Sequence, residues 1–440
     1  MALGACRLNR HILVLVIAVW ACLGFISCGG STKKNPPSGL KERVLASQGV
    51  SSTSAAGALV ILNAQNDTIA RVSRIPAGNS PGFMAVTPSL DVAAAFDSSS
   101  NTVFAVNTTT EAAIGSGVKL HAAATSMVLP TANQIGYAAV PGATISGFNV
   151  NGDIEVMSFA GSGLTTSIAV DKAQTVISND GGSQLLVFSN DSDSVTILSP
   201  SVAVPPVDTS CLTNPPNAVC TVVPGFDRPV YGIISGSTAY ILNCGPQCGG
   251  IQASVAVFDL PSLSITSTIP VDAATYALLD GTTLYVAGTP ITNNACTGQT
   301  TAATICGRLD VVDLGAGTVT GSAVIADGYH THMDKTANGQ IFIGSLRCTS
   351  VGNVNNPSGE VRGCLSIYKI ADGSVLMPPD NGDVNGLQGF VTRNIEYVAE
   401  GGILRVYDTT KDILLINDFV PQGSIDVVGY VGDVKAIDLF

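Results

Sequence analysis

A short strand-like segment that ends in Asn or Asp recurs along this chain and constrains its fold more than any other feature. Copies such as 365–369 and 404–408 alternate apolar and polar residues, which is the pattern of a β-strand with two different faces. Neighbouring copies start about 40 residues apart in the first half of the chain and further apart in the second. The copies occupy residues 59–63, 103–107, 145–149, 186–190, 255–259, 309–313 and 404–408, with a variant that ends in Lys at 365–369.

Two further strand-like segments precede each copy and one follows it, so each repeat contains four short strands. A period near 40 residues with four strands is typical of a β-propeller, in which each repeat forms one blade. The count predicts an all-β propeller of eight four-stranded blades, with seven blades as the alternative. In the third repeat we expect 167–170, 175–178 and 186–190 to be the first, second and third strands.

The order of strands at the two ends predicts how the ring closes. The chain enters the pattern with third and fourth strands, at 58–75, and leaves it with first and second strands, at 425–439. Joining these halves would complete one composite blade and pair the two free sheet edges.

Composition agrees with this fold and narrows the function. Charged residues make up 12% of the chain and hydrophobic residues 46%, and there are 47 glycines, as expected for many short strands joined by tight turns. Lys and Arg number 20 against 32 Asp and Glu, a formal net charge of −12. Such a surface repels phosphate backbones, so we expect no nucleic-acid partner.

The N-terminus has the pattern of an export signal. Arg7, Arg10 and His11 precede an apolar run at 12–25, which is short for a membrane span and suits a secretory signal. The sequence Phe-Ile-Ser-Cys-Gly-Gly at 25–30 resembles a bacterial lipobox, in which the Cys, here Cys28, is lipidated and becomes the new N-terminus. The alternatives are an ordinary signal peptide cut nearby and an uncleaved anchor.

These features divide the chain into three parts. We expect a lipoprotein signal peptide at 1–27, a flexible tether at 28–56 and a propeller domain at 57–440. The resemblance implies a lipid-anchored protein of the cell envelope. Gly29 rather than Asp after the Cys resembles the pattern that sends lipoproteins to the outer membrane.

Eight of the eleven cysteines fall in the propeller domain as near neighbours in sequence, which favours local disulfides in an oxidising compartment. The near pairs are Cys211 with Cys220, Cys244 with Cys248, Cys296 with Cys306, and Cys348 with Cys364. Metal binding through Cys244 and Cys248 is the alternative, but no second pair stands at ligand spacing. We expect the first pair to lie between blades and the others between second and third strands, so that all four disulfides mark one face of the ring.

One repeat carries a family resemblance. Pro81 and Gly82 before a first strand, Thr87-Pro88-Ser89 at the following turn and Ser100-Asn101-Thr102-Val103 into a third strand resemble the YVTN-type propeller repeat. The nearest match to the Tyr-Val-Thr-Asn signature itself is Leu284-Tyr285-Val286-Ala287. The resemblance covers 58–440 and belongs to the group of quinoprotein amine dehydrogenase-like and lactonase-like propellers. It implies the fold and no particular activity.

Candidate functional residues cluster at the starts of innermost strands. Period-2 alternation predicts that His330, His332 and Asp334 share one side of a strand and reach the channel mouth as general bases or metal ligands. The alternative is that they pack between blades or line a watery channel. The further candidates for ligand binding are His121, Asp227, Arg228 and Asp272.

The sequence leaves two functions open. The first is a non-enzymatic binding module that presents its disulfide-bearing face to a protein, glycan or small ligand. The second is a lactonase-like or other hydrolase whose site lies at the channel mouth. We expect a monomer, assign no metal ligands and predict no cofactor; the alternative is Ca²⁺ held by carboxylates near the channel mouth, such as Asp227 and Asp272. The acidic segment 190–193 resembles part of a Ca²⁺ loop but lacks its Gly and Glu, and we expect it to be a turn.

Overall fold

The computed structural model describes residues 36–438, with internal gaps at 51–55, 72–73, 132–133, 162, 205, 292–305, 350–362 and 379–381. The predicted signal peptide, the lipidation site Cys28 and the first residues of the predicted tether lie outside the described residues. Unit 36–440 is therefore the subject of all that follows.

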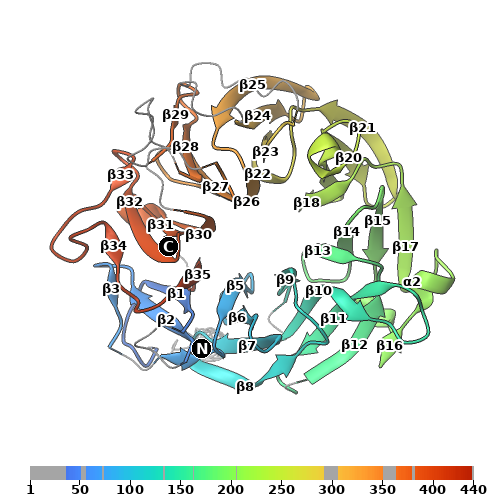
Figure 1. Ribbon diagram of the computed structural model, residues 1–440, viewed down its shortest axis with the longest axis horizontal. Coiled ribbons are helices and arrows are strands. Elements are labelled where there is room, and N and C mark those ends of the chain that lie inside the picture. The colour runs from blue at the N-terminus through green and yellow to red at the C-terminus, as the bar shows by residue number, and fades with distance from the viewer. Residues whose placement is uncertain are drawn as a thin grey trace, which may run out of the picture. The chain divides into compact units, whose positions relative to one another are not determined.

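The described chain forms eight antiparallel sheets arranged in a ring, which confirms the predicted eight-bladed propeller (Figure 1). Within each blade the chain runs from an innermost strand outward. Blade 1 contains β5 (Pro81–Val86), β6 (Val92–Asp97), β7 (Thr102–Asn107) and β8 (Ala112–Lys119); blade 2 contains β9 (Ser126–Val128), β10 (Ile135–Thr144), β11 (Asn151–Ser158) and β12 (Gly163–Ala169). Blade 3 contains β13 (Ala173–Ser178), β14 (Leu185–Ser189), β15 (Ser194–Leu198) and β17 (Cys220–Pro224).

The second half of the ring repeats this order. Blade 4 contains β18 (Pro229–Ser235), β19 (Thr238–Asn243), β20 (Ser254–Asp259) and β21 (Ser264–Pro270); blade 5 contains β22 (Tyr276–Asp280), β23 (Thr283–Gly288), β24 (Gly307–Asp313) and β25 (Thr318–Ile325). Blade 6 contains β26 (Tyr329–Lys335), β27 (Gln340–Leu346), β28 (Leu365–Lys369) and β29 (Val375–Leu376); blade 7 contains β30 (Val384–Phe390), β31 (Ile395–Glu400), β32 (Ile403–Asp408), β33 (Ile413–Leu414) and β34 (Ser424–Ile425).

The second strands form the core of the ring because neighbouring blades cover both of their faces. All six residues of β6 and all six of β31 are buried; β6 is apolar except for its last residue, whereas β31 also buries two glutamates, Glu396 and Glu400. A strand that is covered on both faces does not alternate. The alternating, Asn- or Asp-terminated segments are mostly third strands, whose outward ends reach the solvent.

The ring closes in a way that differs from the prediction. The last blade consists of the C-terminal strand β35 (Val431–Ala436) followed by three N-terminal strands: β1 (Arg43–Gln48), β2 (Ala58–Asn63) and the short pair β3 (Thr68–Ile69) and β4 (Ile75–Pro76). In Figure 1 the red β35 therefore lies beside the blue β1. Among the described residues, the chain enters the ring at a second strand, not at a third, and one strand of this blade comes from the C-terminal end.

This closure corrects the predicted tether at 28–56. The segment contains β1, whose six residues are all buried and which pairs antiparallel with β2 on one side and β35 on the other. Arg43 at its start is also buried and makes ion pairs with Glu111 (2.8 Å) and Asp438 (2.7 Å). A strand of this length without clear alternation resembles a loop in sequence, which is why it was missed.

The third repeat corrects a second prediction. Residues 167–170 belong mostly to the outermost strand of blade 2, while 175–178 and 186–190 fall on the first and second strands of blade 3. The segment 145–149 is a turn before β11. Strand β14 is apolar and ends at a polar turn as third strands do, so the sequence pattern alone shifted the assignment by one strand.

Two of the predicted disulfides are formed where the sequence placed them. Cys244–Cys248 and Cys348–Cys364 are bonded, and each lies between the second and third strand of its blade. Cys306 is also disulfide-bonded and precedes a third strand, whereas Cys296 lies outside the described residues. In antiparallel blades these connections emerge at the same end of the ring as the links between blades, and we call this end the stapled face.

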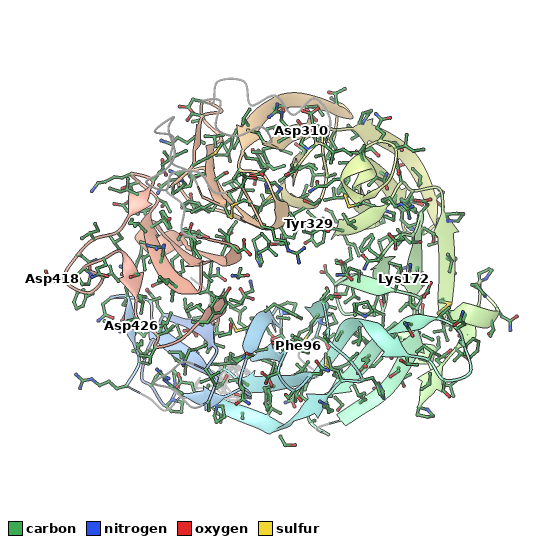
Figure 2. All side chains as sticks on the ribbon, viewed as in Figure 1. Phe96, Lys172, Asp310, Tyr329, Asp418 and Asp426 are labelled. Atoms are coloured by element: carbon green, nitrogen blue, oxygen red, sulfur yellow. A yellow bond between two sulfur atoms is a disulfide. The ribbon has the colours of Figure 1, made fainter. Side chains whose placement is uncertain are left out.

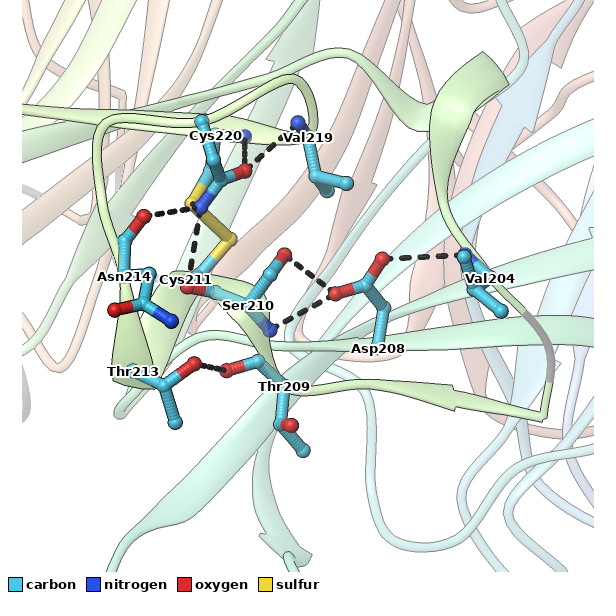
Figure 3. Close-up of a disulfide and its surroundings, with 10 residues drawn as sticks. Val204, Asp208, Thr209, Ser210, Cys211, Thr213, Asn214, Val219 and Cys220 are labelled. Atoms are coloured by element: carbon cyan, nitrogen blue, oxygen red, sulfur yellow. Dashed lines mark hydrogen bonds between the residues drawn. A yellow bond between two sulfur atoms is a disulfide. The ribbon is translucent and has the colours of Figure 1, made fainter.

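The fourth disulfide, Cys211–Cys220, is formed but lies at the opposite end of the ring, which corrects the expectation that all four share one face. It closes the connection from β15 to β17, a link between third and fourth strands (Figure 3). That connection carries the four-residue helix α2 (Ser210–Thr213) and β16 (Val207–Asp208), which pairs with the outer strand of blade 2. Asp208 accepts hydrogen bonds from Ser210 and from the backbone of Val204.

Among the described residues, no helix has the length and apolar character needed to cross a membrane.

Because β1 closes the ring, a single substitution in it should strongly destabilise the fold, although the sequence of this segment predicts a tether. Leu45→Ala removes a fully buried side chain from β1 and should lower the free energy of unfolding by about 2–5 kcal/mol. Val50, which follows β1 and is 42% exposed, provides the matched control: Val50→Ala should have little effect. Chemical denaturation of both variants checks this, and equal stability of Leu45→Ala and the wild type would show that β1 is not part of the sheet.

Candidate functional site

A cavity of about 710 Å³ opens at the stapled face, where innermost strands begin and second strands end. Tyr329, at the start of β26, lies at the inner edge of the ring and faces the central opening (Figure 2). Blades 1, 2, 3, 4 and 6 contribute to the wall, so the cavity is the mouth of the central channel. Its polar and charged lining residues are Thr125, Gln174, Thr175, Ser189, Asn190, Asp191, Arg228, Tyr329, Thr331 and Arg347.

The charges of the lining are mainly positive. Arg228 and Arg347 come from blades 4 and 6, and Asp191 is the acidic residue among the lining side chains. Asp191 is paired with Lys172 at 3.1 Å, so part of its charge is already balanced. Arg228 lies 3.7 Å from Asp193 through its Nε, a distance that leaves its terminal amino groups able to donate elsewhere. In a chain with a formal charge of −12, two arginines at one mouth are a local exception.

The stapled loop of blade 4 forms one side of this mouth. Cys248 lines the cavity and its disulfide with Cys244 closes a single 3₁₀ turn, Gly245–Cys248. Gln247 in this turn donates to the carbonyl of Gly328 (3.2 Å) and accepts from the backbone of Thr289 (2.9 Å). Blades 4, 5 and 6 are thereby tied together around the mouth.

Gly328 is required where the link between blades 5 and 6 passes under this loop. Its φ is +106°, and a Cβ at this position would lie 2.5 Å from the carbonyl oxygen of Leu346. The backbone can therefore deliver Tyr329 to the mouth only with glycine before it.

Asp227 has a structural place beside the mouth. Its carboxylate accepts the backbone N–H groups of Ile251 and Gln252, the latter at 2.6 Å, and so holds the far side of the disulfide loop. The predicted binding candidates Asp227 and Asp272 do not line the cavity, whereas Arg228 does. The acidic turn at 190–193 connects the second and third strands of blade 3 and brings Asp191 to the mouth.

The three residues predicted to share one side of an inner strand are separated by a bulge. In the pairing of β26 with β27, His330 opposes Ser345 and His332 opposes the next residue, Gly344. The extra residue, Thr331, reverses the alternation, so His330 and His332 point to opposite faces. His332 and Asp334 remain on one face. Periodicity could not reveal this because nothing in Tyr-His-Thr-His marks the inserted residue.

His330 is a packed core residue. It is 1% exposed, and its Nε2 lies 3.0 Å from the carbonyl oxygen of Ala326. Burial lowers its pKa to about 4, so the ring is neutral at pH 7. His332 faces the channel, where its Nδ1 lies 2.8 Å from the hydroxyl of Thr331, and burial lowers its pKa to about 3. Of this group only Thr331 lines the cavity.

Asp334 and the acids below the mouth join one blade to the next. The Asp334 carboxylate accepts the backbone N–H of Gly389 in blade 7 at 2.6 Å. Asp433 in the composite blade accepts the backbone N–H of Met84 in blade 1 at 2.7 Å and pairs with Lys435 at 3.2 Å. Burial raises the pKa of both carboxyls. A buried acceptor that loses its hydrogen-bond donor lowers the free energy of unfolding. The two carboxylates therefore have a structural role in the ring.

The channel wall also contains a buried acid and two stacked tyrosines. Burial and the nearby charge of Asp334 raise the pKa of Glu396 well above its usual value, which favours the protonated form. Tyr231 and Tyr276, from blades 4 and 5, stack with ring centroids 4.5 Å apart, and Tyr276 lies 6.4 Å from the His332 ring. These groups give the channel a polar wall whose hydrogen bonds cross blade boundaries.

His121 lies away from the mouth, between blades 1 and 2. Its backbone N–H and its Nδ1 both contact Glu155 Oε1, at 2.9 and 3.0 Å. Asp153 lies nearby on the same face of β11, and one donor atom from each of the three residues lies within 4.8 Å of the other two. Burial raises the pKa of Asp153 to about 8, with a further contribution from the charge of Glu155. Sequence reasoning named His121 and missed both acids, because a buried third strand gave no reason to expect two carboxylates.

Other mouth residues were also missed. Gln174, Tyr329 and Arg347 line the cavity although no motif marks them. Their common signal is position, since each lies at the start of a first strand or the end of a second strand. That signal becomes readable only when the strand register of every blade is known.

Comparisons with known proteins support the fold and go no further. No family model matches the chain, and no curated protein matches its sequence. Among solved structures, the dihydro-heme d1 dehydrogenase NirN in complex with DHE is similar, with a TM-score of 0.60 and 11% identity over 90% of this chain and 75% of that chain. The computationally designed protein Ika8 is similar with a TM-score of 0.53 and 10% identity over 84% of this chain and 98% of that chain. At such identities the likeness shows the propeller fold alone.

The buried neutral ring of His330 predicts a specific acid sensitivity. The pKa of His330 is about 4 in the folded state and 6.5 in the unfolded state. Its contribution to stability is therefore fully present above pH 6.5 and is lost as the pH falls from 6.5 toward 4. Through this group, lowering the pH from 7.5 to 5 should reduce the free energy of unfolding of the wild type by about 2 kcal/mol. His330→Gln removes the titration, so the stability difference between wild type and variant should shrink by that amount. Denaturant unfolding of both proteins at the two pH values measures this, and a constant difference would contradict it.

Proposed function

We propose that the protein is an extracytoplasmic binding module whose propeller takes a small polar ligand at the channel mouth on the stapled face. The observation that supports this most directly is the cavity of about 710 Å³ with Arg228 and Arg347 in its wall. Its size suits a small molecule or a short glycan. The disulfide loop and the ties among blades 4, 5 and 6 keep the wall in place, which lowers the entropy lost on binding.

The chemistry of the wall favours a carboxylated ligand. Guanidinium groups recognise carboxylates through paired hydrogen bonds, and Arg228 and Arg347 approach the cavity from different blades. Gln174, Thr331 and Tyr329 add hydrogen-bonding groups and an aromatic face, which suits a sugar ring. A uronic-acid oligosaccharide combines these features and is the ligand class that we propose.

The location is part of the same proposal. The lipobox-like sequence that ends at Cys28 supports lipid anchoring, and Gly29 supports the outer membrane of the cell envelope. The paired cysteines of the stapled face agree with an oxidising compartment. The YVTN-type resemblance belongs to this proposal as well. We propose that the anchored chain acts as a monomer, with the membrane, through its lipid, and the ligand as its partners.

A hydrolase of the lactonase-like kind is the second candidate. One contact favours it: the hydroxyl of Thr331, which lines the cavity, lies 2.8 Å from Nδ1 of the neutral His332. A hydroxyl beside a neutral imidazole is the arrangement of a nucleophile and its general base. Against it, His330 is committed to the core and Asp334 to the backbone of Gly389. A panel of lactones and esters, with Thr331→Val and His332→Ala as variants, separates the two functions.

The binding proposal predicts that one arginine carries a large share of the affinity. Arg347→Ala should weaken the binding of a uronic-acid oligosaccharide about 10- to 100-fold, because it removes a charge-assisted hydrogen bond. Isothermal titration of the purified chain measures the change. Arg71, an exposed arginine of the composite blade, provides the matched control, and Arg71→Ala should bind as the wild type does. Equal affinity of all three proteins would place the ligand elsewhere.

The anchoring proposal predicts a separate result. Cys28→Ala should abolish the incorporation of labelled palmitate and should release the chain from the membrane fraction of cells that express it. A variant of a cysteine in the signal, Cys22→Ala, is the control and should be lipidated normally. Continued labelling of Cys28→Ala would show that the lipid is attached elsewhere.

A further inference from the structure

Blade 2 contains two neighbouring buried carboxylates that lack the cation found at the same place in blade 5. Asp153 and Glu155 lie two residues apart on β11 and point toward blade 1, below the link that carries His121. Asp153 is 2% exposed and Glu155 is fully buried. Asp153 Oδ1 and Glu155 Oε2 have no hydrogen-bond partner among the residues that the structure describes. Two buried carboxylates with unpaired oxygens require either a bound proton or a nearby cation.

The strand register shows which residue of blade 5 is equivalent to Glu155. Glu155 opposes Ala138 and Ser167, while Asp310 opposes Val286 and Ser322. Both carboxylates accept a backbone N–H from the link before their blade, Glu155 from His121 at 2.9 Å and Asp310 from Asp272 at 2.6 Å. Glu155 and Asp310, the latter labelled in Figure 2, therefore share one structural role.

The neighbouring positions carry opposite charges in the two blades. Two residues before Asp310 stands Arg308, whose Nε lies 3.8 Å from Asp272 and whose charge stabilises the Asp310 carboxylate. The equivalent residue of blade 2 is Asp153, and His121 stands where blade 5 has Asp272. In blade 5 the Arg308 guanidinium therefore offsets part of the charge of the two carboxylates. In blade 2 a second carboxylate and an imidazole occupy the corresponding positions.

From this we infer that His121, Asp153 and Glu155 form a site for a divalent ion of the first transition row, with Zn²⁺ as the ion to test. The ion would occupy the role of the Arg308 guanidinium. One ligand atom from each residue already lies within 4.8 Å of the other two, and ligands about 2.1 Å from one ion stand at most about 4.2 Å apart. The His121 ring is 58% exposed, so it has room to adjust its position beside the carboxylates.

The donor set selects among ions. An imidazole nitrogen with two carboxylates suits Zn²⁺ or Mn²⁺, whereas Ca²⁺ and Mg²⁺ prefer oxygen ligands alone. The exposed His121 leaves a path from the solvent to the buried carboxylates. Three protein ligands also leave one position of a tetrahedral ion for water. Because the site ties the link before blade 2 to the blade's third strand, binding should stabilise the junction between blades 1 and 2.

Titration of the full chain, produced without a polyhistidine tag, with zinc chloride tests this inference. We expect one Zn²⁺ per chain and a rise in Tm on binding. Asp153→Asn should weaken Zn²⁺ binding more than about 100-fold, because it removes a ligand and not merely its support. Asp153→Arg copies the charge pattern of blade 5, so it should abolish Zn²⁺ binding while the Tm without metal stays at or above that of the wild type.

Asp310→Asn is the matched control, since it changes the equivalent carboxylate of a blade that has its own cation. It should bind Zn²⁺ as the wild type does. His121→Ala, which changes an exposed ring, gives a second variant that preserves the fold. Absence of Zn²⁺ uptake at about 100 μM, equal uptake by the wild type and Asp153→Asn, or tighter binding of calcium chloride than of zinc chloride would each overturn the assignment.

Discussion

The pairing of β1 between β35 and β2 is the constraint on which the rest of the ring depends. Without it the composite blade would have an innermost strand from one end of the chain and outer strands from the other, with two open sheet edges between them. The buried Arg43, held by Glu111 of blade 1 and Asp438 beyond β35, fixes this strand at its start. The channel and its mouth require all eight blades in place, so the closure also supports the candidate site.

Hydrogen bonds that cross blade boundaries then set the geometry of the channel. Asp334 binds the backbone of blade 7, Asp433 binds that of blade 1, and Gln388 accepts the N–H of Ala436 at 2.8 Å. Asp334, a catalytic candidate in the sequence analysis, is thus one of several side chains that join inner strands of neighbouring blades, which do not pair with one another. The stapled face is different: its loops tie blades together and leave arginine, tyrosine and amide groups facing a cavity.

The sequence predicted the architecture well because a propeller is built from a repeat of four short strands, and this repeat is visible in the sequence. Blade number followed from counting, and the local pairing of Cys244 with Cys248 and of Cys348 with Cys364 followed from spacing. The details that failed depend on single residues. One inserted residue at Thr331 separates His330 from His332. The polar end of β14 resembles that of a third strand, and the half-polar sequence of β1 resembles a tether. The acids beside His121 could be understood only by comparing registers between blades.

Amide hydrogen exchange of β1 tests the central claim most directly, because it reads the closure in the unmodified protein. If β1 pairs on both sides, the amides of Val44 to Ser47 should exchange as slowly as those of β31, a second strand in the neighbouring blade that is equally buried. Exchange of β1 at the rate of an unstructured chain, while β31 stays protected, would contradict the account and return this segment to a tether.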